Sequence, residues 1–285
     1  MIKKVFDIIE KNLMKIDVLN GTKKIQDIFH EESVECFTVY DEDIIVGIIT
    51  KDELVGAHPN RIAADVMSHK YVIVDYDMCI WEVKEIFDSN KKVSIVLVEK
   101  ERQIIGYVTR LVLDIELGKH LDSLTGLYKK DYMFYHAFNF IRHGKNATII
   151  FLDLNNFGYI DKKYGHIAGD MILKGVADIL NNCLQNDCYL CRYAGDEFAI
   201  VSSDSSNECK LLAENIVKTI EAYSFFNDIS VSAAVGITGG RIKFKEDEEI
   251  LVFLNDLVNV ASLASTKAKK DITTPVVIKN IDEIA

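Results

Sequence analysis

The chain has 285 residues, of which 49% are hydrophobic and 27% are charged, a balance typical of folded protein that excludes wholesale disorder. Its net charge of −11 disfavours a nucleic-acid polymer as a partner, because phosphate backbones are bound by clustered lysine and arginine. We expect no signal peptide and no membrane span, since the apolar runs are too short, and six cysteines then predict reduced thiols and a cytoplasmic location.

The first 115 residues contain an internal repeat. "VGIITK" (46–51) aligns with "IGYVTR" (105–110), and "IQDIF" (25–29) aligns with "VKEIF" (83–87). Each copy predicts a strand, an amphipathic helix, two strands joined by a polar turn, and a second helix. Pro59 lies at the junction, so the copies span about 1–57 and 58–115. Two copies are too few for a solenoid and favour a paired module.

This repeat resembles a tandem CBS pair, or Bateman module, in its Gly-aliphatic-aliphatic-Thr strand endings and in "ADVM" (64–67). The resemblance implies an adenosine nucleotide in the clefts between copies, with Thr50 and Glu53 as candidate ligand contacts. Val112 stands at the position that matches Glu53 and cannot accept a hydrogen bond. A packing and dimerisation module without a ligand is the alternative.

From Leu121 onward the pattern alternates between strands and helices. "ATIIFLDL" (147–154) is a continuous apolar run typical of a buried strand, and "RYAGDEFAIV" (192–201) predicts two strands joined by a tight turn. Helices are predicted over 164–184, 208–223 and 249–270, and further strands over 229–238 and 275–280.

Three carboxylates are expected to meet at the end of the buried strand. Asp153 closes that strand, and Asp196 and Glu197 lie at the tip of the following hairpin. Adjacent acids at such a tip are tolerated when they are solvated or when they hold a cation. Hard carboxylate oxygens suit Mg²⁺, which completes its shell with substrate phosphates, so a magnesium site is predicted here.

Three blocks of the second half resemble the signature of GGDEF domains, the diguanylate cyclases: "DSLTGLYKK" (122–130), "FLDLNNFGYIDKKYGHIAGD" (151–170) and "RYAGDEF" (192–198). The resemblance implies an α/β (α+β) domain over 116–285, including a helical connector near 110–125. Its central, mostly antiparallel sheet would be flanked by helices, as in the palm of nucleotidyl cyclases. The implied reaction condenses two GTP molecules into cyclic di-GMP across a homodimer.

The same resemblance assigns roles to individual residues. The implied metal site for Mg²⁺ (or Mn²⁺) comprises Asp153, the Leu154 carbonyl, Asp196 and Glu197; the catalytic residues are Asp196, Glu197 and Lys269; and the nucleotide contacts are Asp161, Asp170, Arg192 and Lys269. Asp170 would accept hydrogen bonds from guanine N1 and N2.

The chain departs from the family at several of these positions. Ala194 replaces the first glycine of the signature, Gly158 and Thr273 replace cationic phosphate contacts, and Asp161 replaces the guanine-reading asparagine. Because an ionised aspartate only accepts hydrogen bonds, neither guanine nor adenine fits Asp161 and Asp170 cleanly.

Two further features are read from this region. The R-x-x-D feedback site is absent, with Gln185 and Cys188 in its place, and the C-x-x-C formed by Cys188 and Cys191 predicts thiols on opposite faces of a strand rather than a metal site. Two functions remain open: a cyclase that uses GTP or another nucleoside triphosphate, or a non-catalytic domain that acts as a nucleotide-binding or protein-interaction switch.

Overall fold

The computed structural model describes residues 3–184, 187–241, 243–244, 246–271 and 273–279. The chain forms two compact units, Met1–Gly118 and Lys119–Ala285. Both units combine helices with sheets, which confirms the predicted α/β (α+β) class.

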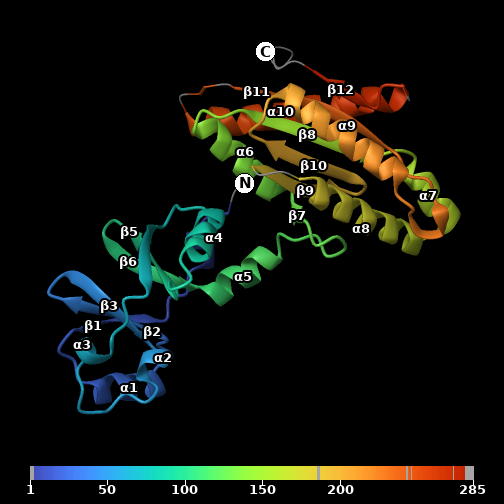
Figure 1. The fold of residues 1–285 in the computed structure, drawn as a ribbon. Helices are drawn as coiled ribbons and strands as arrows, with labels where there is room; N and C mark the ends of the chain where they lie inside the picture. Colours follow the sequence, from blue (N-terminus) through green and yellow to red (C-terminus); the bar gives the residue numbers. More distant parts are fainter. Residues whose placement is uncertain (1–2, 185–186, 242, 245, 272, 280–285) are drawn as a thin grey trace. The chain divides into compact units, whose positions relative to one another are not determined.

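The N-terminal unit repeats one arrangement of elements (Figure 1). In chain order it contains η1 (Val5–Ile8), β1 (Leu13–Asp17), α1 (Thr22–Glu31), β2 (Cys36–Asp41), β3 (Ile44–Thr50), α2 (Lys51–Leu54), α3 (Ala63–Val66), β4 (Tyr71–Asp75), α4 (Ile80–Ser89), β5 (Ile95–Lys100), β6 (Gln103–Thr109) and α5 (Arg110–Gly118).

The sequence repeat is a structural repeat. Strands β1-β2-β3 form one sheet and β4-β5-β6 the other; in each, the first pair is parallel and the second antiparallel. The repeated glycines have a common reason, because a Cβ on Gly47 would lie 2.7 Å from Met67 Sδ and one on Gly106 would lie 2.7 Å from the Glu10 carbonyl oxygen. Another segment therefore packs directly on this strand in both copies.

The C-terminal unit is built around one six-stranded sheet. Its elements are β7 (Tyr128–Lys129), α6 (Lys130–Arg142), β8 (Ala147–Leu154), α7 (Phe157–Tyr164), α8 (His166–Cys183), β9 (Cys188–Ala194), β10 (Glu197–Ser202), α9 (Ser206–Ala222), η2 (Phe226–Asp228), β11 (Ala233–Gly240), α10 (Asp247–Lys270) and β12 (Val276–Ile278).

The strand order is β12-β11-β8-β10-β9-β7, with antiparallel pairs at the centre and a parallel pair at each edge. The mostly antiparallel sheet is thus confirmed. The helix expected from Tyr164 instead begins at His166, because Gly165, with φ of 86°, ends α7 and starts α8.

Helices cover both faces of this sheet (Figure 1). Ile150, Leu152 and Leu154 of β8 pack with α8 and α9, whereas Ile149 and Phe151 pack with α6 and α10. This alternation follows from the two-residue period of a strand. It also places Asp153 on the α10 face.

Helix α10 lies unusually close to the sheet. A Cβ on Gly236 of β11 would lie 1.9 Å from the Ala261 carbonyl oxygen of α10, so only glycine permits this approach. Among the described residues, α10 is the one helix whose length and apolar composition would allow it to cross a membrane, yet 44% of that stretch is buried inside the protein. Leu254, Leu257 and Ala261 have the burial expected of a core helix.

Candidate functional site

Asp153 lies at the carboxyl end of the central strand β8, where a buried apolar run ends. Its carboxylate is 16% exposed, whereas the strand residues on either side of it are buried. Glu197, the first residue of β10, pairs directly opposite Asp153 in the antiparallel ladder. Residues opposite each other project to the same face, so two carboxylates share the α10 side of the sheet.

The hairpin tip explains how alanine is accepted in the signature. Ala194 pairs with Glu197, so Gly195 and Asp196 form the two-residue turn. The positive φ of 49° falls on Gly195, while Ala194 belongs to β9. Alanine therefore carries no backbone strain at this position.

The acidic pair has perturbed protonation. Burial raises the pKa of Glu197, and the charges of Asp153 and Asp196 raise it further. Burial also raises the pKa of Asp153, with Lys269 opposing the shift and Asp196 adding to it. Both carboxyls thus hold their protons more strongly than exposed acids do, chiefly because they are partly buried and also because negative charge is crowded at this strand end.

Lys269 from the last turn of α10 contacts this strand end. Its Nζ lies 2.6 Å from Asp153 Oδ1 and donates a hydrogen bond of 3.2 Å to the Leu154 carbonyl oxygen. These are two of the oxygens that the family resemblance assigns to the metal. The lysine and the implied metal ligands are therefore brought together.

The expected three-carboxylate cluster needs correction. Within the described ranges, no three His, Cys, Asp or Glu side chains gather closely enough to hold a metal ion. Asp153 pairs with Lys269 instead. The donors still fit Mg²⁺, which takes one or two protein carboxylates and shares the rest of its shell with phosphates and water.

A cleft of about 460 Å³ opens beside this strand end. Its lining includes Asp196 and Lys269, the loop after β8, Glu221 and Ser232. The loop is held by Asn155, whose Nδ2 donates to Ser232 Oγ at 2.9 Å. Asn156 adopts a left-handed conformation that asparagine tolerates well. The sequence did not indicate Glu221 or Ser232, because neither belongs to a motif.

Asp161 and Asp170 lie at the α7–α8 junction. Asp161 Oδ2 lies 2.9 Å from His166 Nδ1, and its Oδ1 packs so closely on Gly169 that a Cβ there would lie 2.0 Å away. The Asp161 carboxylate is thereby held against Gly169, the residue that precedes the exposed Asp170. The sequence did not predict the pairing with His166.

Arg192 fixes the hairpin tip. Its Nε and Nη2 donate to the Gly195 carbonyl oxygen at 2.9 and 2.7 Å, and its Nη1 donates to Asp122 Oδ1 at 2.8 Å. Although burial alone raises the pKa of Asp122, hydrogen bonds from Arg192 and Thr125 outweigh it and lower that pKa. The first signature block therefore braces the third, a role that the sequence analysis had not assigned to Asp122.

The other departures have local explanations. Gly158 faces open space beside the cleft, and Thr273 donates to Asp271 in the turn after α10. Cys188 packs with the α8–α9 face and Cys191 with the α6–α10 face, so the opposite orientation of these thiols is confirmed. Gln185 lies outside the described residues.

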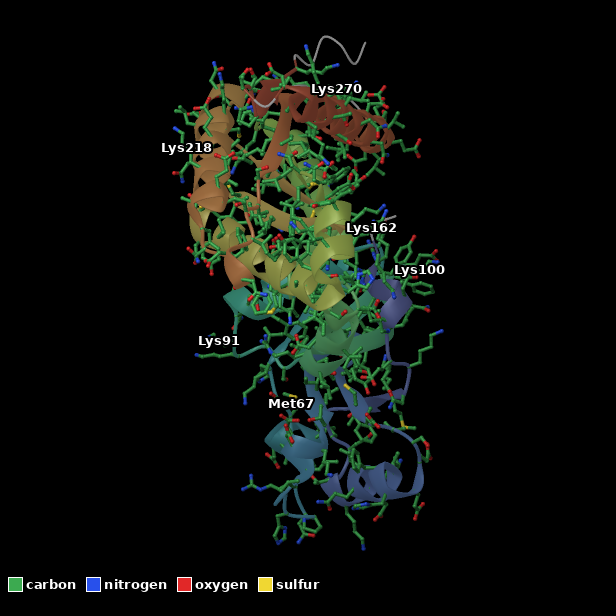
Figure 2. The ribbon with its side chains drawn as sticks, turned by 90° about the vertical axis from the view of Figure 1, so that its right-hand side faces the viewer. Met67, Lys91, Lys100, Lys162, Lys218 and Lys270 are labelled. Carbon is green, nitrogen blue, oxygen red and sulfur yellow. The ribbon has the colours of Figure 1, made fainter. Side chains whose placement is uncertain are left out.

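A second cleft lies within the N-terminal unit, between the two repeats. Its charged lining residues are Lys51, Lys70, Lys91 and Arg110 together with Glu35, Asp52 and Glu53. Arg110 donates to the Phe87 carbonyl oxygen at 2.8 Å, and Figure 2 shows Lys91 projecting from the chain.

The structure places both predicted ligand contacts, Thr50 and Glu53, in this second cleft. Glu53 Oε2 accepts from the backbone N of Thr50 at 3.0 Å and from Thr50 Oγ1 at 2.6 Å. The pair forms a capping box at the start of α2. Glu53 is thus positioned by helix capping.

Family models match both parts of the chain. "Diguanylate cyclase, GGDEF domain" matches residues 119–273, and "CBS domain" matches residues 63–111. The two domains follow each other in the predicted order.

Individual proteins show similar sequences and folds. The chain is 32% identical over 127 residues to diguanylate cyclase DgcS of Shewanella oneidensis, covering 43% of each protein. It is 38% identical over 88 residues to the cyclic di-GMP phosphodiesterase PdeR of Escherichia coli, covering 30% of this chain and 13% of that protein. The chain thus spans less than half of either relative.

Among solved structures, the chain resembles the coiled coil and GGDEF domain of DgcB from Caulobacter crescentus in complex with c-di-GMP. The TM-score is 0.50 at 17% identity, covering 60% of this chain and 92% of that one. At this identity the likeness shows the fold alone.

Proposed function

The chain belongs to the GGDEF domain family, and on that premise we propose that its C-terminal unit is a diguanylate cyclase-type nucleotidyltransferase in second-messenger signalling. The 3′-oxygen of each of two GTP molecules would attack the α-phosphorus of the other, and two pyrophosphates would leave. The observation that supports this most is the meeting of Asp153, Glu197 and Lys269 at one end of the central strand.

The metal would be held by Asp153, the Leu154 carbonyl and either Asp196 or Glu197. A bound Mg²⁺ (or Mn²⁺) supplies positive charge against the phosphates and lowers the pKa of a coordinated hydroxyl. Glu197 has a raised pKa, which suits a group that accepts a proton from the 3′-hydroxyl. The ammonium of Lys269 would bind the phosphate oxygens as a positive point charge.

The nucleobase would lie at the α7–α8 junction. Asp170 is exposed there and would accept from guanine N1 and N2. Asp161, held by its contact with His166, would orient the edge of the base. Arg192 would support nucleotide binding indirectly, because its donors are used on Gly195 and Asp122.

A non-catalytic nucleotide-binding or protein-interaction switch is the second candidate. Gly158 and Thr273 remove two phosphate contacts, which corresponds to about 3–6 kcal/mol, or on the order of a hundred- to ten-thousandfold in affinity. The chain is also similar to PdeR, which is named as a phosphodiesterase, so sequence similarity of this kind is not limited to proteins named as cyclases.

Incubating the purified full chain with Mg²⁺ and labelled GTP, ATP or both separates these two functions. Chromatography of the products should reveal a cyclic dinucleotide that is lost when the metal is chelated. If every nucleotide mixture gives none, the switch replaces the cyclase.

For the N-terminal part we propose a regulatory CBS pair over residues 1–115, with an adenosine nucleotide in the cleft containing Thr50 and Glu53. The same strand pairing in both halves supports assigning the first half to this family too. The chain would work as a homodimer, since one active site holds one nucleotide and the product needs two. Sedimentation of the full chain with and without ATP tests this, and a monomer under both conditions at micromolar concentration contradicts it.

A further inference from the structure

Lys269 and the divalent cation have the same oxygens as partners. The ammonium of Lys269 is 2.6 Å from Asp153 Oδ1 and 3.2 Å from the Leu154 carbonyl oxygen. A Mg²⁺ ion coordinated by this pair would lie about 2.0–2.1 Å from each oxygen. The two cations cannot occupy this place together, because they would stand almost in contact and repel each other.

The charges around the site favour one cation at a time. Asp153, Asp196 and Glu197 influence one another electrostatically, and Lys269 is the cation that counters them. The Asp153 carboxylate is 16% exposed, so leaving it without a positive partner is unfavourable. A metal ion can therefore replace Lys269 as the partner of Asp153, but removing Lys269 without a metal leaves the negative charge of Asp153 uncompensated.

The cleft offers Lys269 a second position. Its side chain is 32% exposed and lines the cleft of about 460 Å³. Its ammonium group lies at the end of a flexible four-carbon stem and can therefore move. Gly158, also in the lining, has open space where a Cβ would point. Nucleotide phosphates in this cleft would attract an ammonium released from Asp153.

We propose that Lys269 is a built-in competitor for the divalent cation, which holds Asp153 and the Leu154 carbonyl until nucleotide phosphates draw it into the cleft. The inference rests on the proposed metal and nucleotide site. Metal and nucleotide then bind with positive coupling, because each favours the position of Lys269 that the other needs. Metal alone binds weakly, and the metal-nucleotide complex binds well.

The test is Mn²⁺ binding to the full chain without nucleotide, measured by electron paramagnetic resonance. Lys269→Gln removes the competing charge and should bind Mn²⁺ about ten- to a hundredfold more tightly than the wild type. Lys269→Arg keeps the cation, and Lys270→Gln changes the neighbouring exposed lysine (Figure 2), so both should match the wild type. Equal or weaker binding by Lys269→Gln overturns the inference.

Two further measurements secure the assignment. Adding Asp153→Asn to Lys269→Gln should abolish the gain, and a gain that persists lies elsewhere and overturns the inference. A GTP analogue that resists cleavage should raise Mn²⁺ affinity at least about tenfold more in the wild type than in Lys269→Gln. Equal enhancement in both proteins also overturns it.

The product assay with Mg²⁺ and GTP keeps the two ideas separate. A chain that makes cyclic dinucleotide while Lys269→Gln gains no Mn²⁺ affinity retains the proposed function and loses this inference. A chain that makes no product while Lys269→Gln gains affinity retains the competition and loses the cyclase.

Discussion

The cleft of the N-terminal unit is lined by four cationic side chains and three carboxylates, whereas the lining of the C-terminal cleft has one cation, Lys269, and two carboxylates, Asp196 and Glu221. Phosphates can meet positive charge directly in the first cleft. In the second they meet a negative field, and Lys269 is itself paired with Asp153. Under the proposed function, the N-terminal cleft would bind phosphates with its own cations, and the C-terminal cleft would bind them through a metal ion held by its carboxylates.

Asp153→Asn tests the metal-dependent side of this contrast. Loss of a metal ligand should weaken metal-dependent GTP binding in the C-terminal cleft by at least about a hundredfold, since even indirect supports of metal sites contribute ten- to a hundredfold. Fluorescent GTP titrations with and without EDTA measure this. Asp178→Asn, at an exposed site on α8, is the control. Unchanged binding in Asp153→Asn would remove the metal from the site.

The complementary change is made in the cationic cleft. Replacing Lys51 and Lys91 together with glutamine should weaken ATP binding measured in EDTA by about tenfold at low salt, because exposed ion pairs each contribute about 0.2–1 kcal/mol. The effect should shrink as salt is added. Lys23 and Lys24 on α1, replaced in the same way, leave the cleft intact and should change nothing. Equal loss in both double variants would indicate general surface charge.

Much of the C-terminal site could be predicted from local patterns. The buried run before Asp153 predicts a central strand, and the turn residues before Glu197 predict the β9–β10 hairpin, in which Glu197 pairs with Ala194. Both features depend on residues close together in sequence. The position of Glu197 opposite Asp153 depends instead on the long-range pairing of β10 with β8. Ala194 carries no backbone strain, because the positive φ of the turn falls on Gly195.

What could not be predicted depends on long-range packing. Lys269 reaches the Leu154 carbonyl across 115 positions of sequence, and Arg192 reaches Asp122 across 70. The first contact needs α10 at the short distance that Gly236 permits, which no local pattern reveals. The pairing of Asp161 with His166 was missed because the positive φ of Gly165 turns the chain between them.

A third prediction concerns base choice at the α7–α8 junction. Asp161→Asn supplies an amide donor for guanine O6 or N7, so GTP binding relative to ATP should improve about three- to tenfold, the range of one neutral hydrogen bond. Competition titrations measure the ratio. His166→Ala removes the partner of Asp161 without adding a donor, so it should not favour GTP. An unchanged ratio in Asp161→Asn would place the base elsewhere.

The last prediction concerns the stability lost by holding Asp153, Asp196 and Glu197 close together. In the folded state the pKa of Glu197 is raised above 4.5 by burial and then by Asp153 and Asp196. The folded chain therefore binds more protons than the unfolded chain between the ordinary and the raised pKa, and its stability falls as pH rises through that window. Glu197→Gln removes this loss, so at pH 8 without divalent cations its melting temperature should rise by at most a few degrees, within the range of a single substitution in a chain of this size. Near pH 4 the two proteins should differ less, because Glu197 is then largely protonated in both states.

Glu214→Gln on α9 is the matched control. A variant that melts below the wild type at pH 8 would mean that Glu197 contributes stabilising contacts, and that crowded negative charge is not what distinguishes this cleft from the cationic one.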